Sequence, residues 1–144
     1  MLHSRRNSRE AALQALFGCD LLDQWSSEIV DAYFKTHHPE LKVDDTDQHY
    51  VFSRRLIEGV FDKRIEIDAL IQSASLNWKV AGMCKIDRNI LRIAVYEIKY
   101  LDDIPAHVSI NEAIEVAKEY GGDESPKFVN AILDKIANLP KPNH

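Results

Sequence analysis

The sequence predicts an all-α protein, and three observations support this fold class. Apolar residues recur three and four positions apart along most of the chain, which is the period of a helix buried on one side. Serine, asparagine or aspartate precedes several of these segments, and glycine or proline follows them, as is typical of helix ends. No segment alternates between apolar and polar residues over the length of a strand.

Four helices are expected in the first half of the chain. Three residues offer caps for the first helix: Ser4, Asn7 and Ser8. A second helix is expected at about 26–37, followed by a polar loop at 43–48. A third helix starts near Asp47, and a break near 61–62 leads into a fourth.

The second half is expected to hold a connection and three more helices. Residues 72–86 are less periodic, with one helical turn near 79–83. Asp87 then caps a helix that runs to about Leu101. Its apolar residues cover more than half of the circumference, as is usual for a central helix. They are Ile90, Leu91, Ile93, Ala94, Val95 and Ile98.

Local signals delimit the last two helices. The residues from Ser109 to Glu112 have the spacing of a capping box, in which the two side chains satisfy the first free N–H groups reciprocally. The glycine pair 121–122 ends this helix, because glycine tolerates a left-handed conformation. Ser125 is expected to cap the last helix, with Pro126 at its first position.

The formal net charge of −5 is distributed unevenly. Within the first ten residues Arg5, Arg6 and Arg9 stand against one acid, Glu10, so this segment carries +2 and the remainder −7. A basic footprint on an acidic body can bind a phosphate backbone at one end and a basic protein elsewhere. The alternative is that the arginines only solvate the N-terminal end.

No motif indicates metal, cofactor or catalytic chemistry. The sequence has no glycine-rich phosphate loop, no HExxH arrangement and no GxSxG elbow, and Cys19 and Cys84 form no CxxC pair. It also has no long apolar run and no signal-peptide pattern. We therefore expect a cytoplasmic protein without cofactor, metal or catalytic residues. An enzyme whose site is assembled only in the folded chain is the alternative.

Two stretches of the sequence resemble the NusB transcription antitermination family. The first is RRNSREAALQALF at 5–17. The second contains DRNILRIAVYE at 87–97, VSINEAIEVAK at 108–118 and SPKFVNAILD at 125–134. The INEAIE and KFVN runs at this spacing are specific. The resemblance covers nearly the whole chain and is strongest from residue 87 onward.

This resemblance implies a fold of two packed three-helix bundles, with about seven helices in total. We expect an N-terminal bundle at about 1–76 and a C-terminal bundle at about 77–139. The resemblance also implies that the protein binds single-stranded boxA-type RNA together with NusE, a small-subunit ribosomal protein. The complex would act with other Nus factors on RNA polymerase that elongates ribosomal RNA operons. Related domains occur fused to RNA methyltransferases, but the end of this chain at His144 favours a separate, non-enzymatic factor.

The resemblance also implies which residues bind RNA. Arg5, Arg6 and Arg9 match the arginine-rich start of the family, and a guanidinium can bind phosphate with two hydrogen bonds. At the start of the last helix, Lys127 adds charge and Phe128 offers a ring for base stacking. The remaining candidates are Gln14, Tyr120 and Glu124.

Two alternatives and two departures from the family pattern accompany this prediction. Phe128 can instead be a core residue, because it precedes the apolar Val129. Asn7 and Ser8 interrupt the basic leader, which would weaken RNA binding without a partner. Ala131 stands where many relatives have glycine. A protein-interaction module that does not bind RNA is the rival function.

Overall fold

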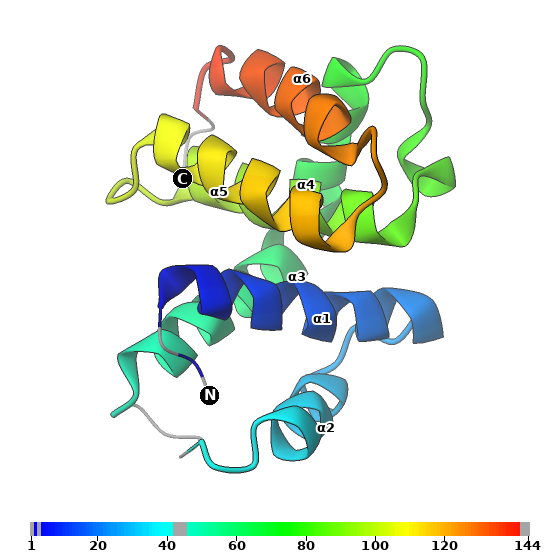
Figure 1. Ribbon diagram of the computed structural model, residues 1–144. Coiled ribbons are helices and arrows are strands. Elements are labelled where there is room, and N and C mark those ends of the chain that lie inside the picture. The colour runs from blue at the N-terminus through cyan, green and yellow to red at the C-terminus, as the bar shows by residue number, and fades with distance from the viewer. Residues whose placement is uncertain (1, 3, 42–45, 142–144) are drawn as a thin grey trace.

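The computed structural model describes residues 2, 4–41 and 46–141, and this part of the chain contains only helices. The predicted fold class is confirmed. Figure 1 shows the arrangement of α1 (Arg5–Leu22), α2 (Ser27–His37), α3 (Gln48–Ala74), the 3₁₀ turn η1 (Val80–Gly82), α4 (Lys85–Tyr100), α5 (Ala106–Tyr120) and α6 (Ser125–Ala137). Of the loop predicted at 43–48, residues 43–45 lie outside the described residues. No described helix has the length and apolarity that crossing a bilayer requires.

The helices form two halves that share their apolar core. In Figure 1, α1 and α2 lie in the lower half with much of α3, and α5 and α6 lie in the upper half in front of α4. The buried apolar side chains form one continuous cluster, which includes Leu16, Leu56, Leu91 and Leu133. The boundary that we propose near residue 76 falls between α3 and η1.

The predicted break at 61–62 is wrong, because α3 continues through it for 27 residues. Gly59 lies just before the predicted break, but it is required by packing and does not end the helix. A Cβ atom at Gly59 would lie 2.1 Å from Cζ of Tyr96 on α4. The glycine therefore lets the Tyr96 ring pack directly against the α3 backbone. The structure has six α-helices and one 3₁₀ turn within the described residues.

Two predicted helix starts are also wrong. Cys84, not Asp87, is the N-cap of α4. Pro105 is the N-cap of α5, so Ser109 lies inside the helix and forms no capping box. The Ser109 hydroxyl donates instead to Oε1 of Glu97 at 2.8 Å, inside the protein. A buried carboxylate needs donors, and this requirement outweighs a local cap.

The turn between α5 and α6 is tight for a steric reason. Gly121 has φ −94°, so the predicted left-handed conformation is wrong. A Cβ atom at Gly121 would lie 2.5 Å from the Ser125 side chain, which explains the need for glycine. Glu124 is the N-cap of α6, one residue before the predicted Ser125. The Ser125 hydroxyl accepts a hydrogen bond of 2.9 Å from the N–H of Gly122 and closes the turn.

The prediction that α4 is central is confirmed. Its six predicted apolar residues are all buried. The helix also buries four charged side chains: Arg88, Arg92, Glu97 and Lys99. Buried charges require partners on neighbouring helices, so these four residues connect α4 to the rest of the protein.

Candidate nucleic-acid interface

The first and fifth helices lie side by side and run in the same direction. Arg6 on α1 bonds Glu112 on α5, and Gln14 on α1 bonds Tyr120 on α5. Both pairs are separated by 106 residues in sequence, so the two helices are parallel and in constant register. Both run from left to right in Figure 1. We call the contact surface of these four residues the α1–α5 seam; it is about 12 Å long from Arg6 to Gln14.

Arg6 lies at the first end of the seam, on the protein surface. Its Nε and Nη2 atoms donate to the two carboxylate oxygens of Glu112 at 3.0 and 2.7 Å. The Arg6 side chain is 48% exposed. The hydrogen bond from Arg6 lowers the pKa of Glu112. Because an exposed ion pair contributes little stability, a phosphate can compete with Glu112 for this guanidinium.

Arg5 is held by stacking. Its guanidinium carbon lies 4.4 Å from the centre of the Phe52 ring on α3, and the side chain is exposed. A stacked guanidinium keeps the N–H groups at its edge free to donate. Arg5 is therefore preorganised to meet an acceptor such as a phosphate oxygen.

Arg9 lies four positions after Arg5 on α1, but its side chain, unlike that of Arg5, is buried. Arg9 is only 5% exposed. Its Nε and Nη2 atoms donate to Glu97 on α4 at 2.8 and 2.7 Å. The guanidinium also lies 5.3 Å from the centre of the Phe52 ring. The predicted RNA contact of Arg9 has no accessible donor to support it, and we assign this residue to the interior.

The second end of the seam is a chain of hydrogen bonds. The amide nitrogen of Gln14 donates to the Tyr120 hydroxyl at 3.2 Å, and its oxygen accepts from the Tyr33 hydroxyl of α2 at 2.5 Å. Tyr33 also lies 3.1 Å from Nε2 of His38. Burial raises the pKa of both Tyr33 and Tyr120. The structure thus brings the two candidates Gln14 and Tyr120 together, with their polar groups held by neighbours.

Beyond Tyr120, the glycine turn leads to the tip of α6. Glu124 and Lys127 are exposed there. Phe128 is half-buried against the core and meets Trp78 edge-on, with 6.5 Å between ring centres. Trp78 is 63% exposed. The two rings line a pocket of about 460 Å³, together with Gly82, Met83, Cys84, Asp87, Gly122, Asp123, Glu124 and Ser125.

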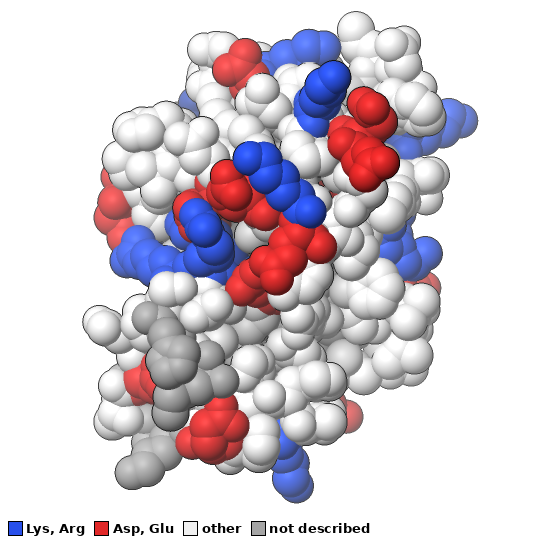
Figure 2. Space-filling view, in the orientation of Figure 1, with Lys and Arg blue, Asp and Glu red and all other residues white. Residues whose placement is uncertain are grey.

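The exposed candidates lie in two places: Arg5 and Arg6 at the start of α1, and Lys127 and the half-buried Phe128 at the start of α6. The α1–α5 seam runs from Arg6 to Tyr120, the last residue of α5. Figure 2 shows that basic and acidic side chains alternate on this face where the two halves meet. The surface is mixed in charge and not uniformly basic.

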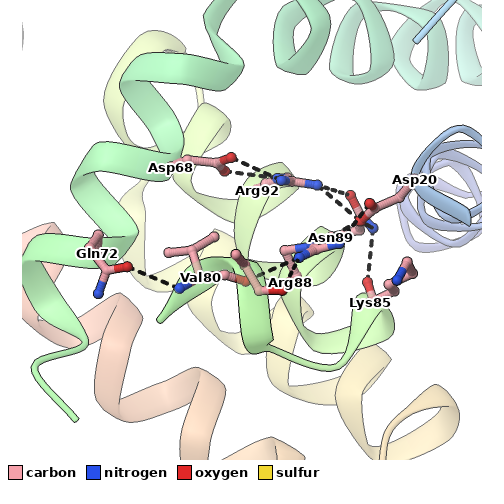
Figure 3. Close-up of polar contacts among 9 residues, drawn as sticks. Asp20, Asp68, Gln72, Val80, Lys85, Arg88, Asn89 and Arg92 are labelled. Atoms are coloured by element: carbon pink, nitrogen blue, oxygen red, sulfur yellow. Dashed lines mark hydrogen bonds and ion pairs between the residues drawn. The ribbon is translucent and has the colours of Figure 1, made fainter. Parts of the chain in front are cut away.

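A second polar cluster, away from the seam, joins three helices. Asp20 of α1 accepts hydrogen bonds from Arg88, Asn89 and Arg92 of α4, at 2.7 to 3.1 Å. Figure 3 shows Arg92 extended between Asp20 and Asp68 of α3. Burial alone would raise the pKa of Asp20, but hydrogen bonds from Arg88 and Asn89 lower it. These charges satisfy one another, so the cluster connects helices and does not resemble an open site.

Several partners of the predicted residues could not be identified from the sequence. Phe52 supports Arg5, Glu112 pairs with Arg6, and Trp78 packs on Phe128. For Glu97 a signal was present, because a charged residue on a helix that is apolar on most sides requires a buried partner. For Phe52 and Trp78 no signal distinguished them from ordinary core residues.

Two further features of the described residues bear on metal and ligand binding. No group of three or more histidine, cysteine, aspartate or glutamate side chains is arranged to hold a metal ion there. A groove of about 480 Å³ between α1 and α2 is mainly apolar and includes Phe17, Ile29 and Tyr33. Neither observation indicates catalytic chemistry.

Comparisons with known proteins point to one family. The family model of the NusB family matches residues 6–138. The transcription antitermination protein NusB of Geotalea uraniireducens is 43% identical over 140 residues, which cover 96% of this chain and 97% of that protein. The NusB structure of T. maritima superposes with a TM-score of 0.83 at 36% identity, covering 99% and 96% of the two chains.

A further solved structure has the same fold. It is the crystal structure of the antitermination factors NusB and NusE in complex with double-stranded RNA. The matched chain has a TM-score of 0.81 at 22% identity, covering 95% of this chain and 98% of that one. At this identity the likeness concerns the fold alone.

Proposed function

The chain belongs to the NusB family, and we propose that it acts as a transcription antitermination factor. In this proposal it binds single-stranded boxA-type RNA together with NusE, and assembles with other Nus factors on RNA polymerase that elongates ribosomal RNA operons. A relative with 43% identity carries the name transcription antitermination protein. A solved complex of the same fold contains NusB, NusE and double-stranded RNA. RNA and NusE are therefore the first ligands to test.

One observation carries the proposal for RNA: two groups of side chains suited to nucleic acid lie at the surface, at the starts of α1 and α6. At one end, Arg5 and Arg6 present guanidinium groups at the surface. At the other end, Lys127 is exposed and Phe128 lines a pocket beside the exposed Trp78. Phosphate binding at the arginines and base stacking at the rings are complementary ways to hold a single strand.

The electrostatic contribution of this surface is small. Three exposed cations, Arg5, Arg6 and Lys127, would give a slope of log K against log salt of about −2 on a single strand. Glu112 already occupies Arg6 and reduces its contribution further. A slope of this size is too low for tight binding alone, so we propose that NusE supplies further contacts. The acidic remainder of the chain suits a partner with a basic surface.

Fluorescence anisotropy with a labelled boxA-type single strand tests the proposal. The competing RNAs are a scrambled single strand and a duplex, and each is measured at two salt concentrations with and without NusE. We expect boxA-type RNA to bind most tightly and NusE to increase its affinity. Equal affinity for the scrambled strand would overturn boxA recognition, and no effect of NusE would overturn cooperative binding.

Charge variants locate the site. Arg5→Gln and Arg6→Gln are each expected to weaken RNA binding and to reduce the salt slope by about 0.7. Lys63→Gln on α3, where Lys63 lies 5.6 Å from the centre of the Tyr100 ring, removes the same charge away from the seam and serves as the control.

The rival function is a protein-interaction module without RNA binding, and one contact favours it: Arg6 is already paired with Glu112. The rival function is supported if Arg5→Gln, Arg6→Gln and Lys63→Gln all bind RNA equally weakly and still bind NusE. That result would also show that the arginines do not form an RNA site.

A further inference from the structure

Arg64 on α3 lies beside the Asp20 cluster but is not satisfied by it. Its guanidinium carbon lies 4.0 Å from the centre of the Trp25 ring. Its Nη1 atom is buried and has no hydrogen-bond partner among the described residues. Burial lowers the pKa of Arg64, and the positive charge of Arg92 lowers it further. The guanidinium has therefore lost water without gaining an acceptor, so an anion placed beside it would offset the cost of its burial.

The nearby carboxylates are occupied by other donors. Asp20 accepts hydrogen bonds from three side chains of α4. Both oxygens of Asp68 accept from Arg92, at 2.8 and 2.9 Å. Asp23 is exposed, and the attraction of all three carboxylates is too small to cancel the lowering of the Arg64 pKa. Arg64 therefore remains a cation that an incoming acceptor can neutralise.

Arg64 lines a hollow of about 570 Å³ between α1, α3 and α4. Ile65 and Gln72 also line it from α3, and their spacing of seven residues puts them on one side of the helix. In Figure 3, Gln72 reaches across to Val80, from whose N–H its oxygen accepts at 3.0 Å. Its Nε2 atom donates to the carbonyl oxygen of Trp78 at 2.9 Å. Gln72 thus fixes the rim of the hollow before any ligand binds.

A second hollow, of about 490 Å³, continues from the first. Both include Gln72 and Ala81, and Leu76 and Trp78 line the second. Leu76 is 84% exposed and Ile65 is 82% exposed, which are the highest values among the large apolar residues of the described part of the chain. We call this combined surface the Arg64 groove, defined by Arg64, Ile65, Gln72, Leu76 and Trp78.

The chemistry of the groove favours one class of occupant. One end offers the unsatisfied guanidinium, and the rest offers apolar side chains whose removal from water is favourable. A protein segment with a carboxylate next to apolar residues complements both. A nucleic acid fits less well, because Asp23 and Asp68 line the first hollow and would repel a chain of phosphates. In addition, Ile65 and Leu76 offer no ring on which a base can stack.

We propose that the Arg64 groove binds a segment of a partner protein, which presents a carboxylate to Arg64 and covers Ile65 and Leu76 with apolar side chains. Arg64 and Gln72 are about 12 Å apart along α3, so a helical segment of about three turns spans the groove. The groove shares Trp78 with the pocket of Phe128, but it includes no residue of the α1–α5 seam. This interaction goes beyond the proposed function and does not depend on RNA.

Peptide binding tests the proposal. The probes are helical peptides of about twelve residues, each with one glutamate beside leucines at helical spacing and without tryptophan. The two tryptophans of the protein line the groove's two hollows, so their fluorescence reports binding there. We expect the glutamate peptides to bind, and matched peptides with glutamine instead to bind about tenfold more weakly. Failure of every glutamate peptide to bind overturns the proposal.

Protein variants locate the carboxylate. Arg64→Gln should weaken binding of a glutamate peptide about tenfold and leave binding of its glutamine counterpart unchanged, which isolates the coupling between the two groups. Arg64→Lys keeps the charge but not the planar fork, so it should recover part of the affinity. Arg55→Gln is the control, because it removes the same charge from an exposed position on α3. Equal losses in Arg55→Gln and Arg64→Gln would show a general charge effect and overturn the contact.

An apolar variant tests the other part of the groove. Leu76 is exposed, so Leu76→Ser should leave urea unfolding almost unchanged. The same variant should weaken peptide binding about fivefold, because the peptide then covers less apolar surface. Unaltered peptide binding in Leu76→Ser would mean that the partner does not cover this part of the groove, and the proposed occupant is then wrong.

Phosphate and RNA distinguish the other possible occupants. Inorganic phosphate and a boxA-type single strand are each added in competition with the glutamate peptide, and we expect neither to displace it. We also expect Arg64→Gln to bind RNA as the unchanged protein does. If RNA affinity falls in Arg64→Gln as in Arg5→Gln, Arg64 belongs to the RNA site and the protein partner is wrong. Displacement of the peptide by phosphate alone would instead identify a general anion site and overturn the proposal.

Discussion

The guanidinium of Arg9 and the carboxylate of Glu97 meet in the interior between α1 and α4, joined by hydrogen bonds of 2.8 and 2.7 Å. Ser109 donates a third bond to the same carboxylate. The arrangement connects α1, α4 and α5 at the base of the seam. Arg9 therefore positions the helix that presents Arg5 and Arg6, without contacting the surface itself.

Replacing Arg9 should destabilise the protein strongly. Arg9→Met leaves Glu97 buried without its charge partner, and we expect a loss of about 3–5 kcal/mol in the free energy of unfolding. The double variant Arg9→Met with Glu97→Leu should recover most of this loss, because no buried charge remains. Urea unfolding measures both. If Arg9→Met unfolds like the unchanged protein but binds RNA less well, Arg9 is an RNA contact after all.

Phe128 offers a test of stacking against packing. Phe128→Leu keeps an apolar side chain against the core but removes the ring, so we expect RNA affinity to fall by about tenfold, corresponding to the loss of one stacked base. Thermal unfolding of the same variant should change little. Val129, the next residue, is buried in the core. Val129→Ala should therefore lower the thermal stability of the protein while changing its RNA affinity little. A Phe128→Leu variant with lower stability and unaltered RNA binding would identify the ring as a core residue only.

Gly59 should tolerate no larger residue. A Cβ atom there would lie 2.1 Å from the Tyr96 ring, so Gly59→Ala forces α3 and α4 apart. We expect a loss of at least about 2 kcal/mol, although alanine ordinarily stabilises a helix relative to glycine. Gly82→Ala is the control, because nothing lies within 4 Å of a Cβ atom there. Denaturant unfolding of the two variants gives the comparison, and similar stabilities would contradict the packing role of Gly59.

The fold class and the order of the helices could be predicted because helical period and end signals are local. The extent of α2 is an example: the prediction of 26–37 agrees with the observed Ser27–His37 and its Ser26 cap. The predicted capping box shows the limit of such signals. Ser109 has the right spacing for a cap, but a buried carboxylate 12 residues earlier in the chain uses its hydroxyl.

The candidate site was less predictable, because it depends on contacts between distant residues. Helical spacing puts Arg5 and Arg9 on one side of α1, but it does not tell which of the two side chains meets solvent and which meets α4. Phe52 and Glu97 decide this, and they lie 47 and 88 residues away from Arg5 and Arg9.

The cluster around Asp20 makes a prediction about acid stability. Hydrogen bonds from Arg88 and Asn89 depress the pKa of Asp20 despite its burial. The stability that Asp20 contributes is then fully present above the unfolded-state pKa of about 3.9, and it is lost as pH falls through the lower folded-state value. Asp20→Asn removes the charge that compensates Arg88 and Arg92, so it should cost about 3 kcal/mol at neutral pH.

Acidification should then distinguish Asp20→Asn from the unchanged protein. Between about pH 5 and the most acidic condition at which the protein folds, stability should fall less steeply in the variant, because one depressed carboxyl group is missing. Urea unfolding across this range measures both slopes, with the exposed Asp134→Asn as a control for the loss of a surface carboxylate. Parallel curves for Asp20→Asn and the unchanged protein would mean that Asp20 titrates alike in the folded and unfolded chains. In that case the bonds in Figure 3 do not stabilise its charged form.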